Sequence, residues 1–307
     1  MRKLSSNFPM LSVIFVASGK RLPFVKRLMD SLTSYPQKFL EIITVDNDSC
    51  PNVSEWVKEN FPSVVIFRNK ENIGTAKAYN IAINQSRGKY LMLINDDCYL
   101  KDKVAKKAVD FLELHPEFMG LGLSLLNPDG TPQFMKLHIF SFWPFNPRKP
   151  QRITFLGTNN LLCRKEAFQT VGLFDENYFF FNEDLDWSWR AWRTRIQFYY
   201  KPEFKIYHGH GFFEKPSFKL GRSLARDIAD LYFYKKNVAI ILKFIKAFYK
   251  RRLRHSLRKT NKIELYPELK TLLNIEKPEI LNNIYNIQKI LVNGNITDLI
   301  SRIKSLT

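Results

Sequence analysis

Short apolar runs alternate with amphipathic stretches through the first hundred residues of the 307-residue chain. The apolar runs are rich in Val, Ile and Leu and too short for helices, so they predict buried strands of a mainly parallel sheet. These strands are expected at residues 11–17, 41–46, 64–68 and 90–95, with helices between them at 23–34, 53–61 and 75–85. Strand–helix–strand alternation predicts an open α/β sheet that binds ligands at the carboxyl ends of its strands.

The pattern changes in the second half of the chain. A helix at 103–115 and a strand at 119–126 precede an aromatic and proline-rich stretch at 137–150, which we interpret as a long loop near an acceptor. Two further strands are predicted at 197–200 and 204–208, and from residue 217 onward the pattern is helical. We therefore divide the chain into an α/β domain of residues 1–220 and a helical region of residues 221–307.

Positive charge is concentrated in the helical region. The chain has a formal net charge of +19, and residues 221–307 hold 18 basic and 7 acidic side chains. Residues 235–262 contain 11 Lys or Arg and no acid; the apolar residues among them are Ile240, Ile241, Phe244, Ile245, Phe248 and Leu253. This pattern predicts a basic amphipathic helix for an anionic membrane surface, with a solvated basic face as the alternative. No recognised DNA- or RNA-binding motif accompanies it, so we do not expect a nucleic-acid partner.

The remaining composition excludes several classes of protein. The three cysteines are far apart and lack a CxxC spacing, which argues against a zinc ribbon or a secreted disulfide scaffold. The first residues do not form a signal peptide, and no uncharged apolar stretch reaches the 18 residues of a spanning helix. We expect a cytoplasmic protein that can rest on the inner face of a membrane.

Acidic residues follow two of the predicted strands. Asn95, Asp96 and Asp97 come directly after one buried strand, and Asp46 ends another. Oxygen ligands at such strand ends suit Mg²⁺ or Mn²⁺ bridging phosphates, while an acid after a strand can contact a base or ribose. The alternative is that both segments are polar turns, which Asn and Asp favour.

Two other segments add candidate ligand contacts. Asn72 and Gly74 lie where the chain turns into a helix, so backbone amides there can approach a ligand, although a simple helix cap is the alternative. His208 and His210 stand two apart beside glycines, a pattern that is more often structural or at the surface than a pair of metal ligands.

An acidic cluster opens the helix predicted at 183–195. It comprises Glu183, Asp184 and Asp186 and follows the aromatic run at 178–181. Acids at a helix start are favoured by the macrodipole, which offers a purely structural explanation. Aromatic neighbours desolvate a carboxylate and raise its pKa, however, as a general base requires.

Taken in order, these segments resemble glycosyltransferase family 2 enzymes of the GT-A fold, in particular rhamnosyltransferase-like bacterial enzymes that build surface polysaccharides. Each motif is degenerate alone, but six in this order are specific. They are VDNDS at 45–49, NIGTAKAYN at 72–80, LINDD at 93–97, GTNNLLCRKEAFQTVGLFDE at 157–176, FFFNEDLDWSWR at 179–190 and YHGHG at 207–211. The chain departs from the family where Pro51 replaces a second acid and where Arg195 replaces the usual glycine.

The resemblance implies a GT-A open mixed sheet flanked by helices, with a basic helical extension. It also implies an inverting transfer of a sugar from a nucleotide-diphosphate sugar, such as dTDP-rhamnose or a UDP-sugar, to a hydroxyl of a glycan or lipid-linked acceptor. Asp184 would then be the general base, while Glu183 and Asp186 would position the acceptor or the helix.

On the donor side, the resemblance implies that Asp97, with Asp96 or Asn95, holds Mg²⁺ or Mn²⁺ across the diphosphate. His208 would complete these contacts. The nucleotide would meet Asp46, with Asn72 and Gly74 beside it, and Arg190 would offset charge in the site.

Two alternatives remain open at this point. A nucleotidyltransferase also needs paired carboxylates and Mg²⁺, but the expected basic glycine-rich loop is represented only by Ser18–Arg21. A non-catalytic membrane- or nucleic-acid-binding protein would explain the basic region, although it would not need Asp97, Asp184 or His208. The dependence on salt concentration should discriminate between a binding protein and an enzyme, since simple phosphate binding weakens steeply with ionic strength.

Overall fold

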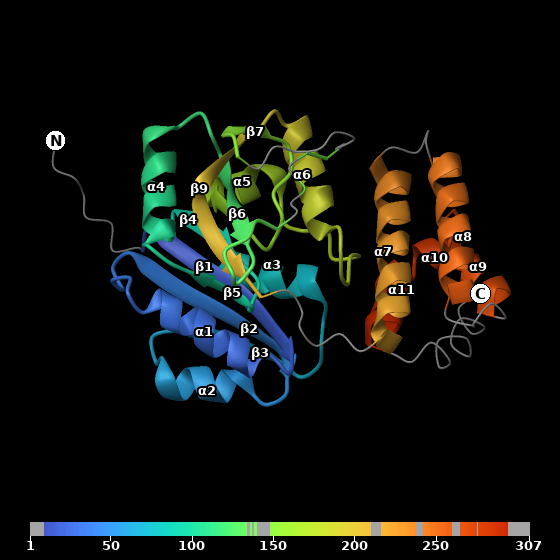
Figure 1. The fold of residues 1–307 in the computed structure, drawn as a ribbon, viewed down its shortest axis with the longest axis horizontal. Coiled ribbons are helices and arrows are strands. Elements are labelled where there is room, and N and C mark those ends of the chain that lie inside the picture. Colours follow the sequence, from blue (N-terminus) through green and yellow to red (C-terminus); the bar gives the residue numbers. More distant parts are fainter. Residues whose placement is uncertain are drawn as a thin grey trace. The chain divides into compact units, whose positions relative to one another are not determined.

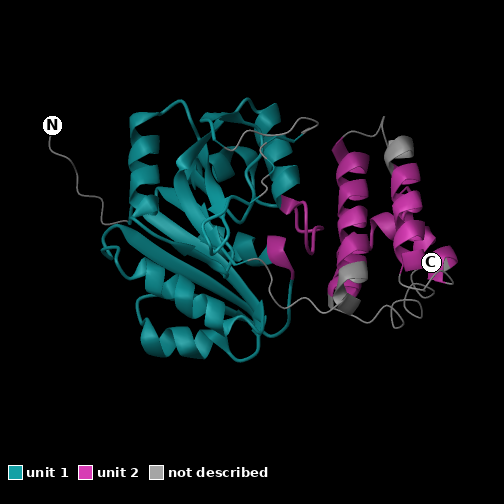
Figure 2. Cartoon of the chain, viewed as in Figure 1, with its two compact units in different colours: residues 1–73, 77–174, 184–212 teal, residues 74–76, 175–183, 213–307 magenta. Residues whose placement is uncertain are grey.

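The computed structural model describes residues 9–133, 136, 138–139, 148–209, 216–237, 242–259, 265–274 and 276–293. The chain forms two compact units, coloured teal and magenta in Figure 2. The first comprises residues 1–73, 77–174 and 184–212, and the second comprises residues 74–76, 175–183 and 213–307. The functional boundary near residue 220 stays a prediction.

The amino-terminal half of the first unit is a parallel sheet, as its apolar runs predict (Figure 1). In chain order its elements are β1 (Leu11–Gly19), α1 (Leu22–Leu32), β2 (Leu40–Ser49), α2 (Val53–Asn60), β3 (Val65–Asn69), α3 (Thr75–Gln85) and β4 (Tyr90–Leu93). The strands pair in the order β3-β2-β1-β4, all parallel. Buried Val, Ile and Leu side chains explain the continuous apolar runs of β1, β2 and β4, whereas the side chains of β3 are half-buried or exposed.

The sheet continues beyond β4 in the order β8-β6-β9-β5, through both antiparallel and parallel pairings. The elements after β4 are β5 (Cys98–Leu100), α4 (Val104–Leu114), β6 (Gly120–Leu126), β7 (Gln151–Ile153), β8 (Leu161–Arg164), α5 (Lys165–Val171), α6 (Glu183–Arg193) and β9 (Phe198–His208). Strand β6 runs parallel to β9, while β8 joins β4 and β6 in antiparallel fashion. The predicted open mixed sheet flanked by helices is confirmed. The loop predicted at 137–150 lies largely outside the described residues.

The two strands predicted at 197–200 and 204–208 are one strand, β9. Along β6 the pairing register slips, since Leu123 faces Lys201 whereas Ser124 faces Lys205. The skipped residues include Pro202, which has no backbone N–H to give to a neighbouring strand. A bulge therefore interrupts the hydrogen-bond ladder without ending the strand. In the sequence pattern the same bulge looked like a gap between two strands.

The second unit is helical, as predicted. It contains α7 (Pro216–Asn237), α8 (Leu242–Lys259), α9 (Tyr266–Thr271), α10 (Pro278–Leu281) and α11 (Ile284–Asn293). The described helices pack around a core of aliphatic side chains that includes Leu224, Ile228, Leu257, Leu269 and Ile287. No helix in the described ranges is long and apolar enough to cross a membrane.

The predicted basic helix corresponds to α8, but its apolar stripe does not all face outward. Leu253 is buried in the core of the helical unit, together with Tyr249 and Leu257. Packing against α7 and α9 thus uses part of the face that we assigned to a membrane. Phe248 is 57% exposed. Ile240 and Ile241 lie outside the described residues.

Candidate active site

Pairing of β5 with β9 brings an acid and a histidine together. Cys98 faces His208 in this antiparallel pair, and Asp97 lies just before it. The Gly209 N–H donates to the Asp97 backbone carbonyl at 2.9 Å, which fixes the junction. As a result His208 Nε2 lies 3.2 Å from Asp97 Oδ1, and both side chains are buried. We call these two residues the acid–histidine pair.

The orientation of the His208 ring follows from Gln133. The amide nitrogen of Gln133 donates to three carbonyl oxygens, those of Leu126, the Asn127 side chain and the His208 backbone. Its oxygen Oε1 must therefore be the atom that faces His208 Nδ1, at 2.9 Å, and only an N–H can satisfy it there. When Nδ1 alone carries the proton, the lone pair of Nε2 is directed toward Asp97 and is available to a cation bound between the two residues.

The remaining contacts of the acid–histidine pair suit a hard cation. Asn95 Nδ2 lies 3.3 Å from His208 Nε2. Asp97 Oδ1 is buried and accepts no hydrogen bond within the described part of the chain. A carboxylate oxygen and an imidazole nitrogen that converge in this way are the donor atoms that Mg²⁺ or Mn²⁺ would require.

Cys98 is the third potential ligand atom near this point, since the ligand atoms of Asp97, Cys98 and His208 lie within 4.8 Å of one another. Burial raises the pKa of the Cys98 thiol, and the charge of Asp97 raises it further. The thiol therefore stays protonated, and it points to the Asn159 carbonyl. Oxygen and nitrogen ligands, rather than sulfur, define the site.

Arg21 holds both acids of the DD sequence, and sequence reasoning missed this role. Its Nε lies 3.0 and 2.9 Å from the two oxygens of Asp96, and its Nη2 lies 2.9 Å from Asp97 Oδ2. Arg21 follows β1, so its position at the carboxyl edge of the parallel strands was the available signal. Asp96 is thus engaged through both oxygens, whereas Asp97 keeps Oδ1 for another partner.

The two acids differ in their pKa values. Burial raises the pKa of Asp96 to about 6, although Arg21 opposes the rise. Burial would also raise the pKa of Asp97, but His208 and Arg21 outweigh it and lower the value to about 2. Asp97 is therefore the carboxylate that remains ionised, as a metal ligand must.

Asp184 lies in the first turn of α6 and is partly buried. Its Oδ2 accepts the Thr158 N–H at 3.3 Å, and its Oδ1 accepts the Leu185 N–H at 2.8 Å. Burial raises the pKa of Asp184, while those two N–H groups and the charge of Lys136 oppose the rise. A carboxylate with a raised pKa is a stronger base than an ordinary aspartate, as a group that accepts a proton from a hydroxyl requires.

Two of the predicted site residues make their hydrogen bonds within the fold. Arg190 donates from Nε to the buried Asp186 at 2.9 Å and from its other nitrogens to the carbonyls of Val171 and Leu173. Its guanidinium thus contacts the carbonyls at and just after the end of α5, and the cofactor contact of Arg190 stays a prediction. The ion pair of Arg190 with Asp186 is consistent with the charge balance that we also expected Arg190 to give the acidic cluster.

Asp46 also faces its own chain. Its side chain is fully buried and accepts hydrogen bonds from the Ser49 N–H and from the N–H and hydroxyl of Ser54. These bonds outweigh burial and lower the pKa of Asp46. The polar-turn alternative therefore accounts for these contacts, and the nucleotide contact of Asp46 stays a prediction.

Asn72 belongs to a small amide cluster at the same sheet edge. Asn47 Nδ2 donates to Asn72 Oδ1 at 2.9 Å, and Asn47 Oδ1 accepts from Asn69 and from the Ile73 N–H. Asn47 is the residue that sequence reasoning passed over, although it lies in the VDNDS motif.

The remaining predicted residues belong to the second unit or to undescribed parts. Gly74 has φ +82°, and a Cβ there would lie 2.6 Å from the Phe179 carbonyl oxygen. Close backbone packing thus explains this glycine without a ligand. Glu183 is buried. His210 lies outside the described residues.

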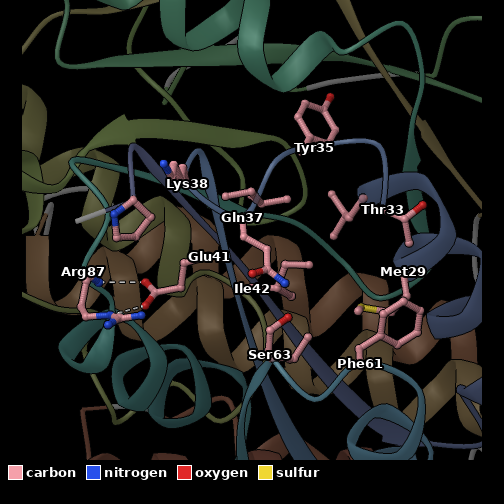
Figure 3. Close-up of a pocket in the computed structure, with 14 residues that line it drawn as sticks. Met29, Thr33, Tyr35, Gln37, Lys38, Glu41, Ile42, Phe61, Ser63 and Arg87 are labelled. Carbon is pink, nitrogen blue, oxygen red and sulfur yellow. Dashed lines mark hydrogen bonds and ion pairs between the residues drawn. The ribbon is translucent and has the colours of Figure 1, made fainter. Parts of the chain in front are cut away.

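A cavity of about 720 Å³ lies at the opposite edge of the sheet, near the amino ends of β2 and β3 (Figure 3). Its most polar feature is Glu41, which is already paired with Arg87 and with the Ser12 hydroxyl. Glu41 and Arg87 satisfy one another, so the cavity lacks the converging acid and histidine of the carboxyl edge.

Comparison with known proteins agrees with this geometry. The model of the family described as glycosyl transferase family 2 matches residues 12–219, more than half of the chain. The chain therefore belongs to glycosyltransferase family 2. The predicted enzyme class, a glycosyltransferase, is confirmed, and the non-catalytic alternative is set aside.

Two curated relatives illustrate the similarity. An N-acetylglucosaminyl-diphospho-decaprenol L-rhamnosyltransferase of Mycobacterium tuberculosis is 24% identical over 220 residues, which cover 61% of this chain and 72% of the relative. The poly(ribitol-phosphate) β-N-acetylglucosaminyltransferase TarS of Staphylococcus aureus is 24% identical over 165 residues, 47% of this chain and 28% of TarS.

Solved structures confirm the GT-A type of fold. GalNAc-T7 with UDP, GalNAc and Mn²⁺ superposes with a TM-score of 0.60 and 16% identity, covering 98% of this chain and 57% of that one. S. aureus TarS 1–349 gives a TM-score of 0.55 and 15% identity, covering 91% and 90%.

Proposed function

We propose that the chain transfers a sugar, with inversion, from a nucleotide-diphosphate sugar to a hydroxyl group of a glycan or lipid-linked acceptor. The observation that carries this proposal is the acid–histidine pair, in which Asp97 Oδ1 and His208 Nε2 converge 3.2 Å apart beside Arg21. An inverting displacement needs positive charge at the leaving diphosphate and a base at the attacking hydroxyl.

The chain's own residues supply the donor side. Asp97 and His208 would hold Mg²⁺ or Mn²⁺, and Gln133 would keep the His208 ring in the tautomer that offers Nε2. A bound cation of this kind neutralises the charge that grows on the departing diphosphate. Arg21 contacts both acids and holds Asp96 in an ion pair.

Asp184 would act on the acceptor side. Its raised pKa allows it to receive the proton of the attacking hydroxyl, and the Thr158 and Leu185 N–H groups hold the carboxylate in place. Glu183 and Asp186 would support the start of the same helix. A general base in this position contributes on the order of 10²–10⁴-fold to the rate.

Donor binding tests the metal-dependent half of the proposal. UDP, dTDP and GDP would be titrated into the full-length protein by calorimetry, with Mn²⁺, with Mg²⁺ and with EDTA. We expect binding of one nucleotide that EDTA weakens at least about tenfold, as a cation on the diphosphate would require. Binding by Asp97→Ala that is as tight and as metal-dependent as that of wild type would refute the assigned ligand.

The names of the relatives suggest which substrates to try first. The M. tuberculosis relative is a rhamnosyltransferase of a lipid-linked N-acetylglucosamine diphosphate, and TarS is an N-acetylglucosaminyltransferase whose structure has been solved with UDP. dTDP-rhamnose and UDP-N-acetylglucosamine are therefore the first donors, and a polyprenyl-diphosphate sugar is the first acceptor. The anomeric configuration of the product, measured by NMR, tests inversion.

Association with an anionic membrane surface is a separate part of the proposal. Exposed basic residues of α8 include Arg251, Arg254, Arg258 and Lys259, and Phe248 is exposed on the same helix. Each basic residue near an anionic surface contributes about 1 kcal/mol, and a partly inserted aromatic adds to this. Sedimentation with vesicles of anionic lipid at physiological salt should retain wild type and release a variant with Phe248→Ser and Arg254→Ser. Membrane association would be refuted if wild type sedimented equally with neutral vesicles. It would also be refuted if wild type did not sediment with the anionic vesicles.

A further inference from the structure

The segment at residues 175–183 leads into the acidic start of α6, and it belongs to the helical unit rather than to the sheet. We call it the latch loop. Its backbone is unusual, because Phe181 and Asn182 both have φ values near +67°, at 68° and 66°. Two consecutive residues with side chains in this region are strained, so neighbouring groups must hold them.

Gln288 of α11 provides the main hold. Its side chain is fully buried, its Oε1 accepts the Phe179 N–H at 2.8 Å, and its Nε2 donates to the Phe180 carbonyl at 3.0 Å. Nε2 also donates to the Ala225 carbonyl of α7 at 3.2 Å. The Gln288 side-chain amide thus both accepts from and donates to the backbone of the latch loop, as a neighbouring strand would. It links the loop to α11 and α7.

Other contacts within the helical unit secure the two ends of the latch loop. At its start, Asp175 accepts from Tyr232 and Lys236 of α7. At its end, Asn182 donates to Asp230 at 2.6 Å, and Asp230 also accepts the hydroxyl of Tyr249 from α8.

The aromatic side chains of the latch loop are held by the same helices. The Phe179 ring packs edge-on against Tyr285 of α11, with centroids 5.3 Å apart. Arg226 of α7 lies over the Phe181 ring at 4.5 Å. The Phe179 carbonyl also accepts the Thr75 N–H at 2.8 Å, which links the loop to the first residue of α3.

We propose that Gln288 is a positioning residue for the transfer reaction: it holds the latch loop in the strained conformation from which α6, with Asp184 in its first turn, begins. The C-terminal helices would thereby contribute to catalysis in addition to any role in docking. This inference rests on the proposed role of Asp184 as base. It predicts an effect on turnover but not on nucleotide binding, because the proposed metal ligands Asp97 and His208 lie on the sheet.

The test uses five full-length proteins, wild type and four variants. Gln288→Met has a similar side-chain length but cannot hydrogen-bond, and Asn286→Met makes the same change at an exposed position of α11. Ile287→Ala controls for general loosening, because it removes buried volume from the same helix without touching a loop hydrogen bond. Hydrogen–deuterium exchange of peptides covering 175–185 is compared with nucleotide affinity, turnover and thermal stability.

We expect Gln288→Met to speed exchange in the latch loop at least about tenfold, because the buried Phe179 N–H loses its acceptor. kcat should fall about tenfold or more, while KM for the donor and the affinity for UDP, dTDP or GDP change by less than about twofold. Gln288→Glu, which retains the acceptor for Phe179, should recover part of the protection. Asn286→Met should behave as wild type.

Two results would overturn the inference. One is exchange in the latch loop of Gln288→Met no faster than in Asn286→Met. The other is an equal loss of kcat and protection in Ile287→Ala at matched thermal stability, which would reduce Gln288 to a packing role. If wild type binds no nucleotide and transfers no sugar, the proposed function fails, whereas the exchange measurement still decides whether Gln288 holds the loop.

Discussion

At the scale of single residues, the site depends on how buried polar atoms are shared. Arg21 takes both oxygens of Asp96, whereas Asp97 keeps Oδ1 beside His208 Nε2. Adjacent acids in the sequence thereby acquire different roles. Asp184 is a third case, since burial raises its pKa while two backbone N–H groups and Lys136 limit the rise.

The raised pKa of Asp184 predicts a change in the pH dependence of stability. A carboxyl group whose pKa is higher in the folded protein stabilises the fold at low pH, and this contribution is lost as pH rises through the folded-state pKa. Asp184→Asn remains neutral, so its Tm relative to wild type should increase as pH rises from the ordinary aspartate pKa of 3.8 through the raised pKa of the folded protein. Its turnover should fall on the order of 10²–10⁴-fold. A Tm difference that does not vary with pH would contradict the raised pKa.

Lys136 offers a second test of the same group. Its charge lowers the pKa of Asp184, so Lys136→Met should raise that pKa further. Because the base acts in its ionised form, the acidic limb of the profile of kcat/KM against pH should move to higher pH. Lys149→Met, at an exposed position, is the matched control. Movement of the limb to lower pH, or none, would be inconsistent with this assignment.

Gln133 should influence metal affinity without being a ligand. Gln133→Met removes the acceptor for His208 Nδ1–H and frees the ring to rotate or change tautomer. Loss of such a supporting partner typically weakens metal binding about 10–100-fold. Mn²⁺ titration followed by electron paramagnetic resonance measures this directly, with the exposed Gln197→Met as control. Unchanged Mn²⁺ affinity in Gln133→Met would show that the amide does not orient the ligand.

At the scale of elements, the end of α6 shows how a residue other than the family's usual glycine affects the stability of the fold. Arg195 takes φ +62° directly after the helix, a conformation that favours glycine. Arg195→Gly should therefore raise the free energy of unfolding by about 1 kcal/mol. Arg193→Gly, at the last residue of the helix and also exposed, should lower it, because glycine is a poor helix former. Urea unfolding measures both, and a loss of stability in Arg195→Gly would contradict this explanation.

Elements also show where sequence patterns succeed. The helix predicted at 75–85 matches α3 (Thr75–Gln85), and the apolar runs coincide with β1 to β4 within a few residues, because a buried strand leaves a continuous hydrophobic signal. Strand β9 was divided wrongly, since Pro202 interrupts the pattern but not the strand. The short β5 carries too few residues to show a period, yet it brings Asp97 to His208.

At the scale of the whole molecule, the sequence could indicate the edge of the sheet on which the site lies but not the partners of each side chain. Asp97 and His208 are 111 positions apart, and only the pairing of β5 with β9 shows that they meet. Asp46 and Arg190 matched the expected pattern of ligand contacts, but their hydrogen bonds go to nearby backbone and side-chain groups. Arg21 and Gln133 carried no pattern of their own, because an isolated residue acquires its role from tertiary contacts.

The measurement that tests the central claim most directly is release of nucleoside diphosphate from a panel of dTDP-, UDP- and GDP-sugars. Wild type would be assayed with Mn²⁺, Mg²⁺ or EDTA, with and without a polyprenyl-diphosphate sugar acceptor, beside Asp97→Ala and Asp184→Asn. Our account predicts release from one donor that requires the divalent ion, increases with the acceptor and is lost in both variants. Release that persists in EDTA and in both variants would contradict it.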